Sequence, residues 1–336
     1  MTTMATQPLL MSPAAQPPCP HLSLSTEPSM EERFTAAVEA TPSTGEPGLS
    51  RARMGVFALT DGRVRAPNDD TQNESLDIIH HVLTLMLDGN IYRAPLGKNI
   101  ENVVDIGTGT GIWAIDFADK YPDAKVIGTD LSPIQPSWVP PNIDFQIDDC
   151  TQPWTFEENS LDYVHIRWLF GSIKDWTELF KQAYRCLKPG GWLETHEASV
   201  QFSSDDGSVH DKTAMGQFGS LFIEGGKKMG RWMTIIEDGV QRKSVEEANF
   251  VNIHEEDFKT PIGTWPKDRK QKEIGSFQQL AVEQDTEGSL IYIAGLQGWT
   301  QEEVRVYIKH LKKEFRDPAI HGYYKQKIVW AQKPAE

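Results

Sequence analysis

The stretch VVDIGTGTG, from Val103 to Gly111, decides the fold of this chain. Its β-branched start predicts a buried strand, its alternating glycines predict a tight loop, and the following Ile112 begins a helical pattern. Glycine lets the backbone come close to a ligand where a Cβ would clash. A second apolar run follows and ends at Asp130. Strand, glycine loop, helix and strand in this order predict one βαβ unit with a ligand site where its strands end.

The alternation of strands and helices continues along the chain. Strands alternating with helices form mainly parallel sheets covered on both faces. We therefore predict a doubly wound α/β core, with its ligand crevice outside the carboxyl ends of the strands. The predicted elements of this core are 103–106, 112–120, 126–129, 143–147, 163–166, 176–187 and 192–200.

Further segments flank the core. Apolar residues within 68–89 share one face at helical spacing, which predicts a helix placed to lie across the ligand-binding edge. The stretch 203–239 is glycine-rich and weakly patterned. Two helices are predicted over 270–296 and 300–315. If the last apolar run, 327–331, returns to the sheet, these two helices are an insertion over the core rather than a separate domain.

The glycine loop distinguishes between two nucleoside cofactors. The dinucleotide fingerprint requires glycine or alanine three positions after its second glycine, and Ile112 stands there. Asp105 would repel a pyrophosphate but attract the ammonium and sulfonium charges of S-adenosylmethionine. Asp130 suits the ribose hydroxyls of either cofactor. The loop therefore favours S-adenosylmethionine; the simpler alternative is that both carboxylates cap turns and the glycines serve packing.

The third predicted strand ends in Asp148-Asp149-Cys150. An acidic side chain and the next amide could receive an adenine there; the alternative is a solvated turn. No metal-ligating set is predicted. The candidate cofactor-binding residues are Asp105, Gly107, Thr108, Gly109, Gly111, Asp130, Leu131, Asp148, Asp149 and Cys150.

The stretch 103–150 resembles the class I S-adenosylmethionine-dependent methyltransferases and, more narrowly, the LaeA-like methyltransferases of filamentous fungi. The narrower resemblance continues through DYVHIRWLFGSIKDW (162–176), LKPGGWLETHE (187–197), FKTPIGTWPKDRKQKEIG (258–275) and GWTQEEV (298–304). It implies a Rossmann-like, mainly parallel seven-stranded sheet with helical additions, and S-adenosylmethionine as cofactor. Upstream, Asn73 and Ser75 stand where the family usually has an acidic residue and Arg.

The resemblance also implies a methyltransferase linked to fungal secondary metabolism, either as a regulator or as a tailoring enzyme. Regulators of this family act in the nucleus with velvet-domain partners, so a velvet-type partner is implied by analogy. No motif names the methyl acceptor, whether small molecule or protein. The alternatives are a catalytically weak scaffold that acts through a protein partner and an NAD-dependent oxidoreductase, which Asp130 alone would also suit.

Methyl transfer is an in-line displacement that depends mainly on alignment in a water-poor pocket. If the acceptor must lose a proton, the fourth and fifth strands offer His165, His196 and Glu197 as bases. His165 is the candidate catalytic residue, and a structural, hydrogen-bonded histidine is the alternative. Four tryptophans are expected either to line a pocket for a flat acceptor or to belong to the core. They are Trp113, Trp138, Trp154 and Trp168.

Composition sets the remaining expectations. The 336 residues include 33 basic and 48 acidic ones, a net charge of −15, so we expect no direct binding of nucleic acid. Three separated cysteines indicate neither a disulfide framework nor a zinc site. No run approaches the roughly 20 apolar residues of a membrane helix, so we expect no membrane association and a cytoplasmic or nuclear protein.

The same patterns set the expected domain boundaries. Residues 1–55 are rich in Pro, Ser and Thr and are expected to form a disordered tail. Residues 68–335 are expected to form the methyltransferase domain. Its expected parts are a helical cap over 68–98, the cofactor-binding core over 99–202, and substrate-side helices and final strands over 203–335.

Overall fold

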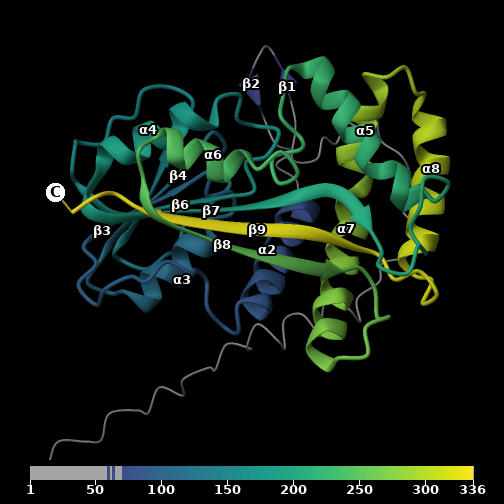
Figure 1. Ribbon diagram of the computed structural model, residues 1–336, viewed down its shortest axis with the longest axis horizontal. Coiled ribbons are helices and arrows are strands. Elements are labelled where there is room, and N and C mark those ends of the chain that lie inside the picture. The colour runs from purple at the N-terminus through teal and green to yellow at the C-terminus, as the bar shows by residue number, and fades with distance from the viewer. Residues whose placement is uncertain (1–58, 61–62, 65–69, 336) are drawn as a thin grey trace, which may run out of the picture. The chain divides into compact units, whose positions relative to one another are not determined.

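The computed structural model describes residues 59–60, 63–64 and 70–335. The tail expected over 1–55 lies outside the described residues. Two short strands, β1 (Leu59–Thr60) and β2 (Arg63–Val64), pair antiparallel. From residue 70 the chain belongs to one compact unit built around a single large sheet (Figure 1).

Seven strands form this sheet in the order β5-β4-β3-β6-β7-β9-β8. The first five strands of the order pair parallel, whereas β9 pairs antiparallel with both β7 and β8. The chain runs outward from β3 to β5, then crosses back to β6 on the other side of β3, which makes a switch point between β3 and β6. The predicted doubly wound, mainly parallel seven-stranded sheet is thereby confirmed. The strands are β3 (Asn102–Ile106), β4 (Lys125–Asp130), β5 (Ile143–Ile147), β6 (Leu161–Arg167), β7 (Leu187–Ser203), β8 (Val251–Pro261) and β9 (Tyr323–Gln332).

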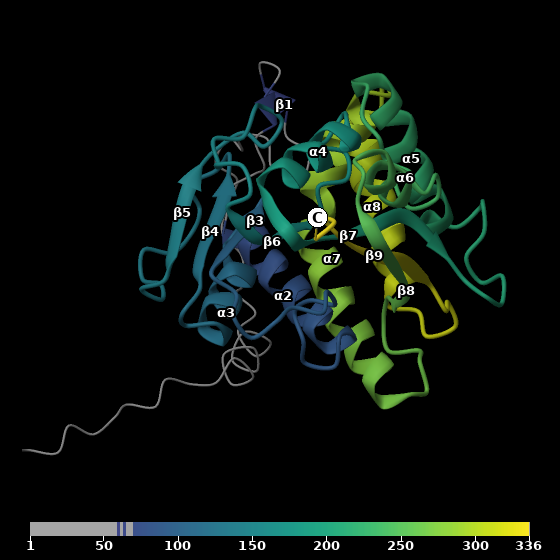
Figure 2. The ribbon, with the colours of Figure 1, turned by 60° about the vertical axis from the view of Figure 1, so that its left-hand side comes forward.

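Helices cover both faces of the sheet because its central strands are apolar on both sides. On one face lie α2 (Asp70–Met86) and α3 (Ile112–Lys120), and on the other lie α4 (Trp176–Cys186) and α6 (Val240–Glu247) (Figures 1 and 2). Trp113 and Phe117 of α3 pack against Tyr163 of β6. Trp176 and Phe180 of α4 are buried on the opposite face. The two apolar layers hold the central strands in a dry environment.

The weakly patterned stretch 203–239 contains a helix, α5 (Ala214–Met229), that periodicity did not reveal. Its glycines lower helix propensity but allow close packing. A Cβ on Gly219 would lie 2.7 Å from the side chain of Gln201 in β7, and one on Gly225 would lie 2.8 Å from Ile293. The glycines therefore let α5 approach β7 and α7 (Arg269–Gly295).

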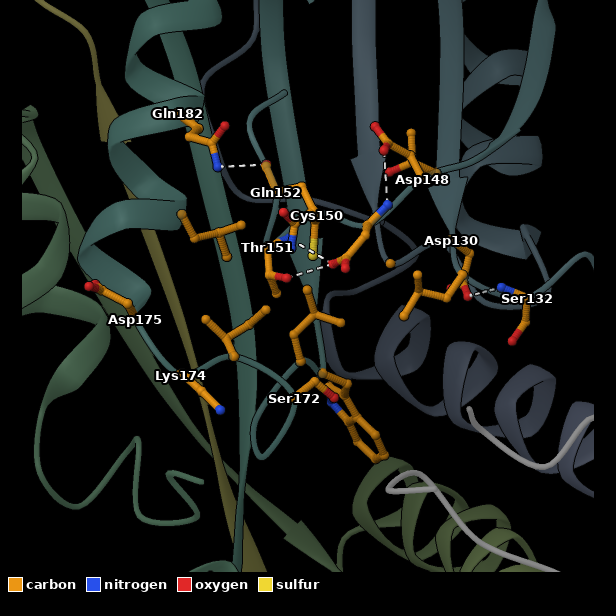
Figure 3. A pocket seen from close by; sticks show the side chains of 18 of the residues that line it. Asp130, Ser132, Asp148, Cys150, Thr151, Gln152, Ser172, Lys174, Asp175 and Gln182 are labelled. Atoms are coloured by element: carbon orange, nitrogen blue, oxygen red, sulfur yellow. Dashed lines mark hydrogen bonds between the residues drawn. The ribbon is translucent and has the colours of Figure 1, made fainter. Parts of the chain in front are cut away.

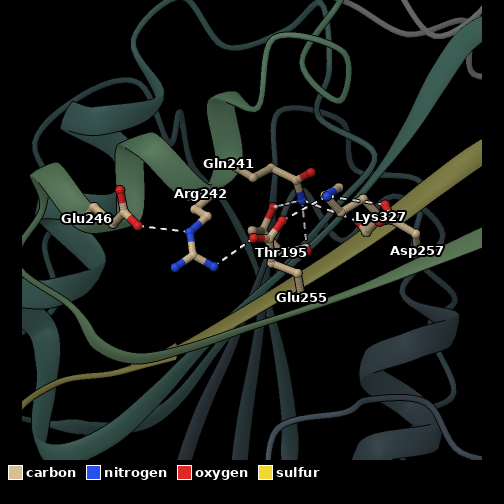
Figure 4. Close-up of polar contacts among 7 residues, drawn as sticks. All are labelled: Thr195, Gln241, Arg242, Glu246, Glu255, Asp257 and Lys327. Atoms are coloured by element: carbon tan, nitrogen blue, oxygen red, sulfur yellow. Dashed lines mark hydrogen bonds and ion pairs between the residues drawn. The ribbon is translucent and has the colours of Figure 1, made fainter.

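The last apolar run does return to the sheet, as β9, so α7 and α8 (Gln301–Phe315) form an insertion over the core. Polar contacts join β9 to its neighbours (Figure 4). Lys327 of β9 pairs with Glu255 of β8 at 2.8 Å, and Arg242 of α6 pairs with the same carboxylate at 2.7 Å. Gln241 donates to the carbonyl of Thr195 in β7 at 3.0 Å. These contacts tie β9 to β8 and tie α6 to both β8 and β7.

Among the described helices, none is both long and apolar enough to cross a membrane.

Candidate active site

A cavity of about 490 Å³ lies at the carboxyl ends of β3, β4, β5 and β6, beside the switch point (Figure 3). Its size falls within the roughly 300–1,000 Å³ of small-molecule pockets. The start of α4 and the loop before it close one side, and α2 closes another. Six of the ten predicted cofactor-binding residues line it: Gly107, Asp130, Leu131, Asp148, Asp149 and Cys150.

Asp130 ends β4 with its carboxylate held by backbone amides. Gly109 N–H donates to Oδ2 at 2.9 Å, and Ser132 N–H donates to Oδ1 at 2.9 Å. Burial raises the pKa of Asp130 above its usual value, and these amides oppose that shift. Each oxygen has a further lone pair, so the carboxylate can also accept hydrogen bonds from a ligand in the cavity.

Asp105 and Thr108 lie beneath the glycine loop rather than on the cavity wall. Thr108 Oγ1 donates to Asp105 Oδ2 at 2.6 Å, and His165 Nδ1 lies 2.7 Å from Asp105 Oδ1. Only 3% of Asp105 and 2% of His165 is exposed. The sequence predicts that Asp105 contacts the cofactor, but in the structure its side chain is buried against Thr108 and His165 and does not line the cavity. The geometry favours a role for Asp105 in holding the loop.

His165 has the surroundings of a structural histidine. Its ring stacks on Trp113, with centroids 3.6 Å apart and planes 3° apart. Burial lowers its pKa, so the ring is neutral near pH 7 and Nδ1–H donates to Asp105. Because His165 does not line the cavity, this position favours the structural alternative over direct proton transfer.

The other two candidate bases are also buried behind the cavity. Burial lowers the pKa of His196 well below its usual range. Burial raises the pKa of Glu197 to about 8, and its carboxyl oxygens accept from the amides of Leu169 at 3.2 Å and Phe170 at 2.9 Å. Glu197 therefore fixes the loop after β6.

The glycine loop has a backbone that requires glycine. Gly107, Gly109 and Gly111 have φ of 71°, 58° and 82°, all in the left-handed region. The amides of Gly107 and Thr108 donate to the carbonyl of Thr129 at 2.8 and 2.9 Å. A Cβ on Gly107 would lie 2.5 Å from Leu169. Gly109 and Gly111 shape the loop without lining the cavity.

The end of the cavity at β5 is acidic. The Asp149 carboxylate accepts from the amide of Thr151 at 3.0 Å and from its hydroxyl at 2.7 Å. Burial and the neighbouring carboxylates raise the pKa of Cys150 to about 12. The Cys150 thiol therefore stays protonated and is a poor nucleophile.

The helix predicted before the core lies over the glycine loop. Gln72 and Leu76 of α2 line the cavity. Thr110 donates to Asp77 at 2.8 Å and ties this helix to the loop. Arg167 donates to Nδ1 of His80 at 3.1 Å, and His80 Nε2 lies 2.8 Å from a carboxylate oxygen of Asp116 in α3. These bonds place α2 as a cover on the cavity.

Three of the four tryptophans divide between the two alternatives, and Trp138 fits neither. Trp113 and Trp154 are buried in the core, and Trp138 is 91% exposed. Trp168 lines the cavity and has φ of 56°, a rare backbone conformation for a bulky residue. Such conformations concentrate at functional sites.

The rest of the loop after β6 also lines the cavity, which the sequence patterns did not predict. Ser172 lines the cavity, and its carbonyl accepts from Arg231 at 2.7 Å. The available signal was position alone, because loops that follow strands beside a switch point form the ligand crevice.

Comparisons with known proteins agree with this arrangement. The sequence model of the family described as methyltransferase domain matches residues 78–255. Methyltransferase pytC of Aspergillus terreus is 40% identical over 273 residues, which cover 80% of this chain and 82% of pytC. The chain belongs to this methyltransferase family.

The methyltransferase is also similar to two further fungal proteins. Probable methyltransferase tdiE of Emericella nidulans is 33% identical over 286 residues, covering 85% of this chain and 88% of tdiE. Secondary metabolism regulator LAE1 of Cochliobolus heterostrophus is 31% identical over 277 residues, covering 80% of this chain and 90% of LAE1. The resemblance to LaeA-like methyltransferases is confirmed, and this methyltransferase is related to proteins of fungal secondary metabolism.

Proposed function

We propose that the methyltransferase binds S-adenosylmethionine in the 490 Å³ cavity and transfers its methyl group to an acceptor bound beside it. The observation that carries the proposal is the Asp130 carboxylate, which faces this cavity next to the glycine loop. S-adenosylmethionine supplies an electrophilic methyl group on a sulfonium, whose positive charge suits an acidic cavity.

The residues present fit this cofactor. The Asp130 oxygens have lone pairs for ribose hydroxyls, and the acidic end at Asp148 and Asp149 gives acceptors for an amino group of adenine. Gly107 adds no side chain to the wall, so a ligand can approach the backbone there. The Asp105 carboxylate beneath the loop adds negative charge near the cofactor without touching it.

The chain would act mainly by orienting the reactants and excluding water. Alignment alone contributes roughly 7–11 kcal/mol to well-oriented reactions. His165 and Glu197 are engaged in holding Asp105 and the loop after β6, respectively. We therefore assign both a positioning role, and α2 provides the cover that keeps water from the reaction.

Titration of S-adenosylhomocysteine into Asp130→Asn tests the proposal. Loss of the ionised acceptor for ribose should weaken binding about tenfold or more, because a hydrogen bond to a charged group is worth roughly 1.5–3 kcal/mol. Asp123→Asn, at an exposed position, is the matched control and should bind as the wild type does. Equal affinity in all three proteins would overturn the assignment of Asp130.

A second role is supported by the similarity to LAE1, a secondary metabolism regulator. In this role the methyltransferase acts through a protein partner, of the velvet type by analogy. Capture of purified velvet-domain protein by wild type and by Asp130→Asn tests it. Retained capture by the variant supports a scaffold that works without cofactor, and no capture by wild type contradicts this role.

A further inference from the structure

A second, smaller pocket of about 130 Å³ adjoins the cofactor cavity. Gln72 and Leu76 of α2 and Trp168 after β6 line both cavities, so the two meet at these side chains. The remaining walls come from β7, α5, α7, β9 and the end of α8. Most of these elements belong to the second half of the chain, outside the cofactor-binding core.

The walls of the small pocket are mainly apolar, and several of the lining side chains are aromatic. The ring of Phe202 lies 4.9 Å from that of Phe218, 5.6 Å from that of Phe315 and 6.3 Å from that of Tyr324. The last two pairs are edge-to-face. An aromatic ligand gains from offset or edge-to-face contacts with such rings in addition to its apolar burial.

A polar side chain whose oxygen accepts no hydrogen bond within the described structure lies in the wall of the pocket. Gln278 of α7 is 1% exposed, and its Oε1 accepts no hydrogen bond from the described residues. A buried acceptor without a donor is unfavourable, so a ligand that donates an O–H or N–H at this point would satisfy it.

The size and charge of the pocket narrow the ligand further. An apolar cavity of roughly 150 Å³ holds one benzene ring. Within the described part of the chain, no carboxylate lines the small pocket. A lysine ammonium would therefore lose its hydration without an opposite charge, which is unfavourable.

We propose that this pocket binds the ring of a neutral aromatic small molecule, the methyl acceptor, whose O–H or N–H group donates to Oε1 of Gln278. The inference rests on the proposed function and adds the chemical class of the acceptor. The ring would lie among side chains of α2, α5 and α7, and Trp168 lines the junction at which this pocket opens to the cofactor cavity.

Fluorine NMR titrations with 4-fluorophenol and fluorobenzene test the inference on the full chain saturated with S-adenosylhomocysteine. The two probes differ by one hydroxyl group. In Gln278→Leu, 4-fluorophenol should bind about five- to tenfold more weakly, the effect of one lost hydrogen bond, while fluorobenzene keeps its affinity. Gln301→Leu, at an exposed position at the start of α8, is the matched control and should leave both affinities unchanged.

A second variant locates the binding site. Val282 lines the small pocket and is half-buried, so Val282→Phe should fill the space and abolish binding of both probes while S-adenosylhomocysteine still binds. Binding of both probes to Val282→Phe as to wild type would overturn the inference, and so would equal losses for the two probes in Gln278→Leu. If the wild type binds S-adenosylhomocysteine but neither probe, the inference is also overturned, while the proposed cofactor site still stands. Failure of S-adenosylhomocysteine to bind would instead overturn the proposed function on which the inference rests.

Discussion

Gly111→Ala tests whether this position of the loop requires glycine for two reasons, its backbone conformation and its close packing. Gly111 has φ of 82°, where an L-residue pays roughly 1–2 kcal/mol. The new Cβ would also lie 2.7 Å from Cε1 of Phe145, an overlap that adds about 1–3 kcal/mol. In Gly109→Ala the new Cβ would contact only Leu76, at 3.7 Å. Since Gly109 has φ of 58°, this variant should lower the free energy of unfolding by about 1–2 kcal/mol through backbone strain alone.

Urea unfolding followed by circular dichroism gives both losses. We expect Gly111→Ala to lower the free energy of unfolding by about 2–5 kcal/mol in total. Phe145→Leu should remove most of the steric part when it is added to Gly111→Ala. Equal losses for the two glycine variants, or no recovery when Phe145 is shortened, would refute the reasoning.

Three further predictions concern particular contacts. Burial raises the pKa of Glu197 to about 8, so the folded protein keeps a proton that the unfolded chain loses as pH rises. The free energy of unfolding of the wild type should therefore fall by roughly 3 kcal/mol relative to that of Glu197→Gln between about pH 5 and 8, measured by urea unfolding. If the difference between the two proteins stays constant over this range, Glu197 does not have the raised pKa of a buried carboxyl. Thr300→Ala removes the capping box of α8 and should lower the free energy of unfolding by about 1 kcal/mol, whereas Ser276→Ala, inside α7, should change it less. Thr110→Val breaks the bond to Asp77 that ties α2 to the loop and should weaken S-adenosylhomocysteine binding several-fold by calorimetry; unchanged affinity would show that α2 is held by other contacts.

The core of the fold followed from local pattern. The run from Val103 to Asp130 specifies strand, loop, helix and strand within one continuous segment, so periodicity and glycine spacing were sufficient. The helix α5 escaped because its glycines serve packing against β7 and α7, a tertiary requirement that reverses local propensity.

The site was predictable only in part. Asp130 and the β5 end line the cavity because strand ends converge at the switch point. The direction of the Asp105 side chain depends on its partners His165 and Thr108. The spacing of residues in the sequence does not predict on which side of the loop this carboxylate lies. The small pocket joins α2 to α5 and α7 across long sequence separation, so no local motif describes it.

Isothermal titration of S-adenosylhomocysteine and, separately, NADH into the wild-type protein tests the central claim most directly. The structure predicts a single site for S-adenosylhomocysteine and no heat of binding for NADH. Binding of NADH without S-adenosylhomocysteine, or of neither, would contradict the claim that this cavity is built for S-adenosylmethionine.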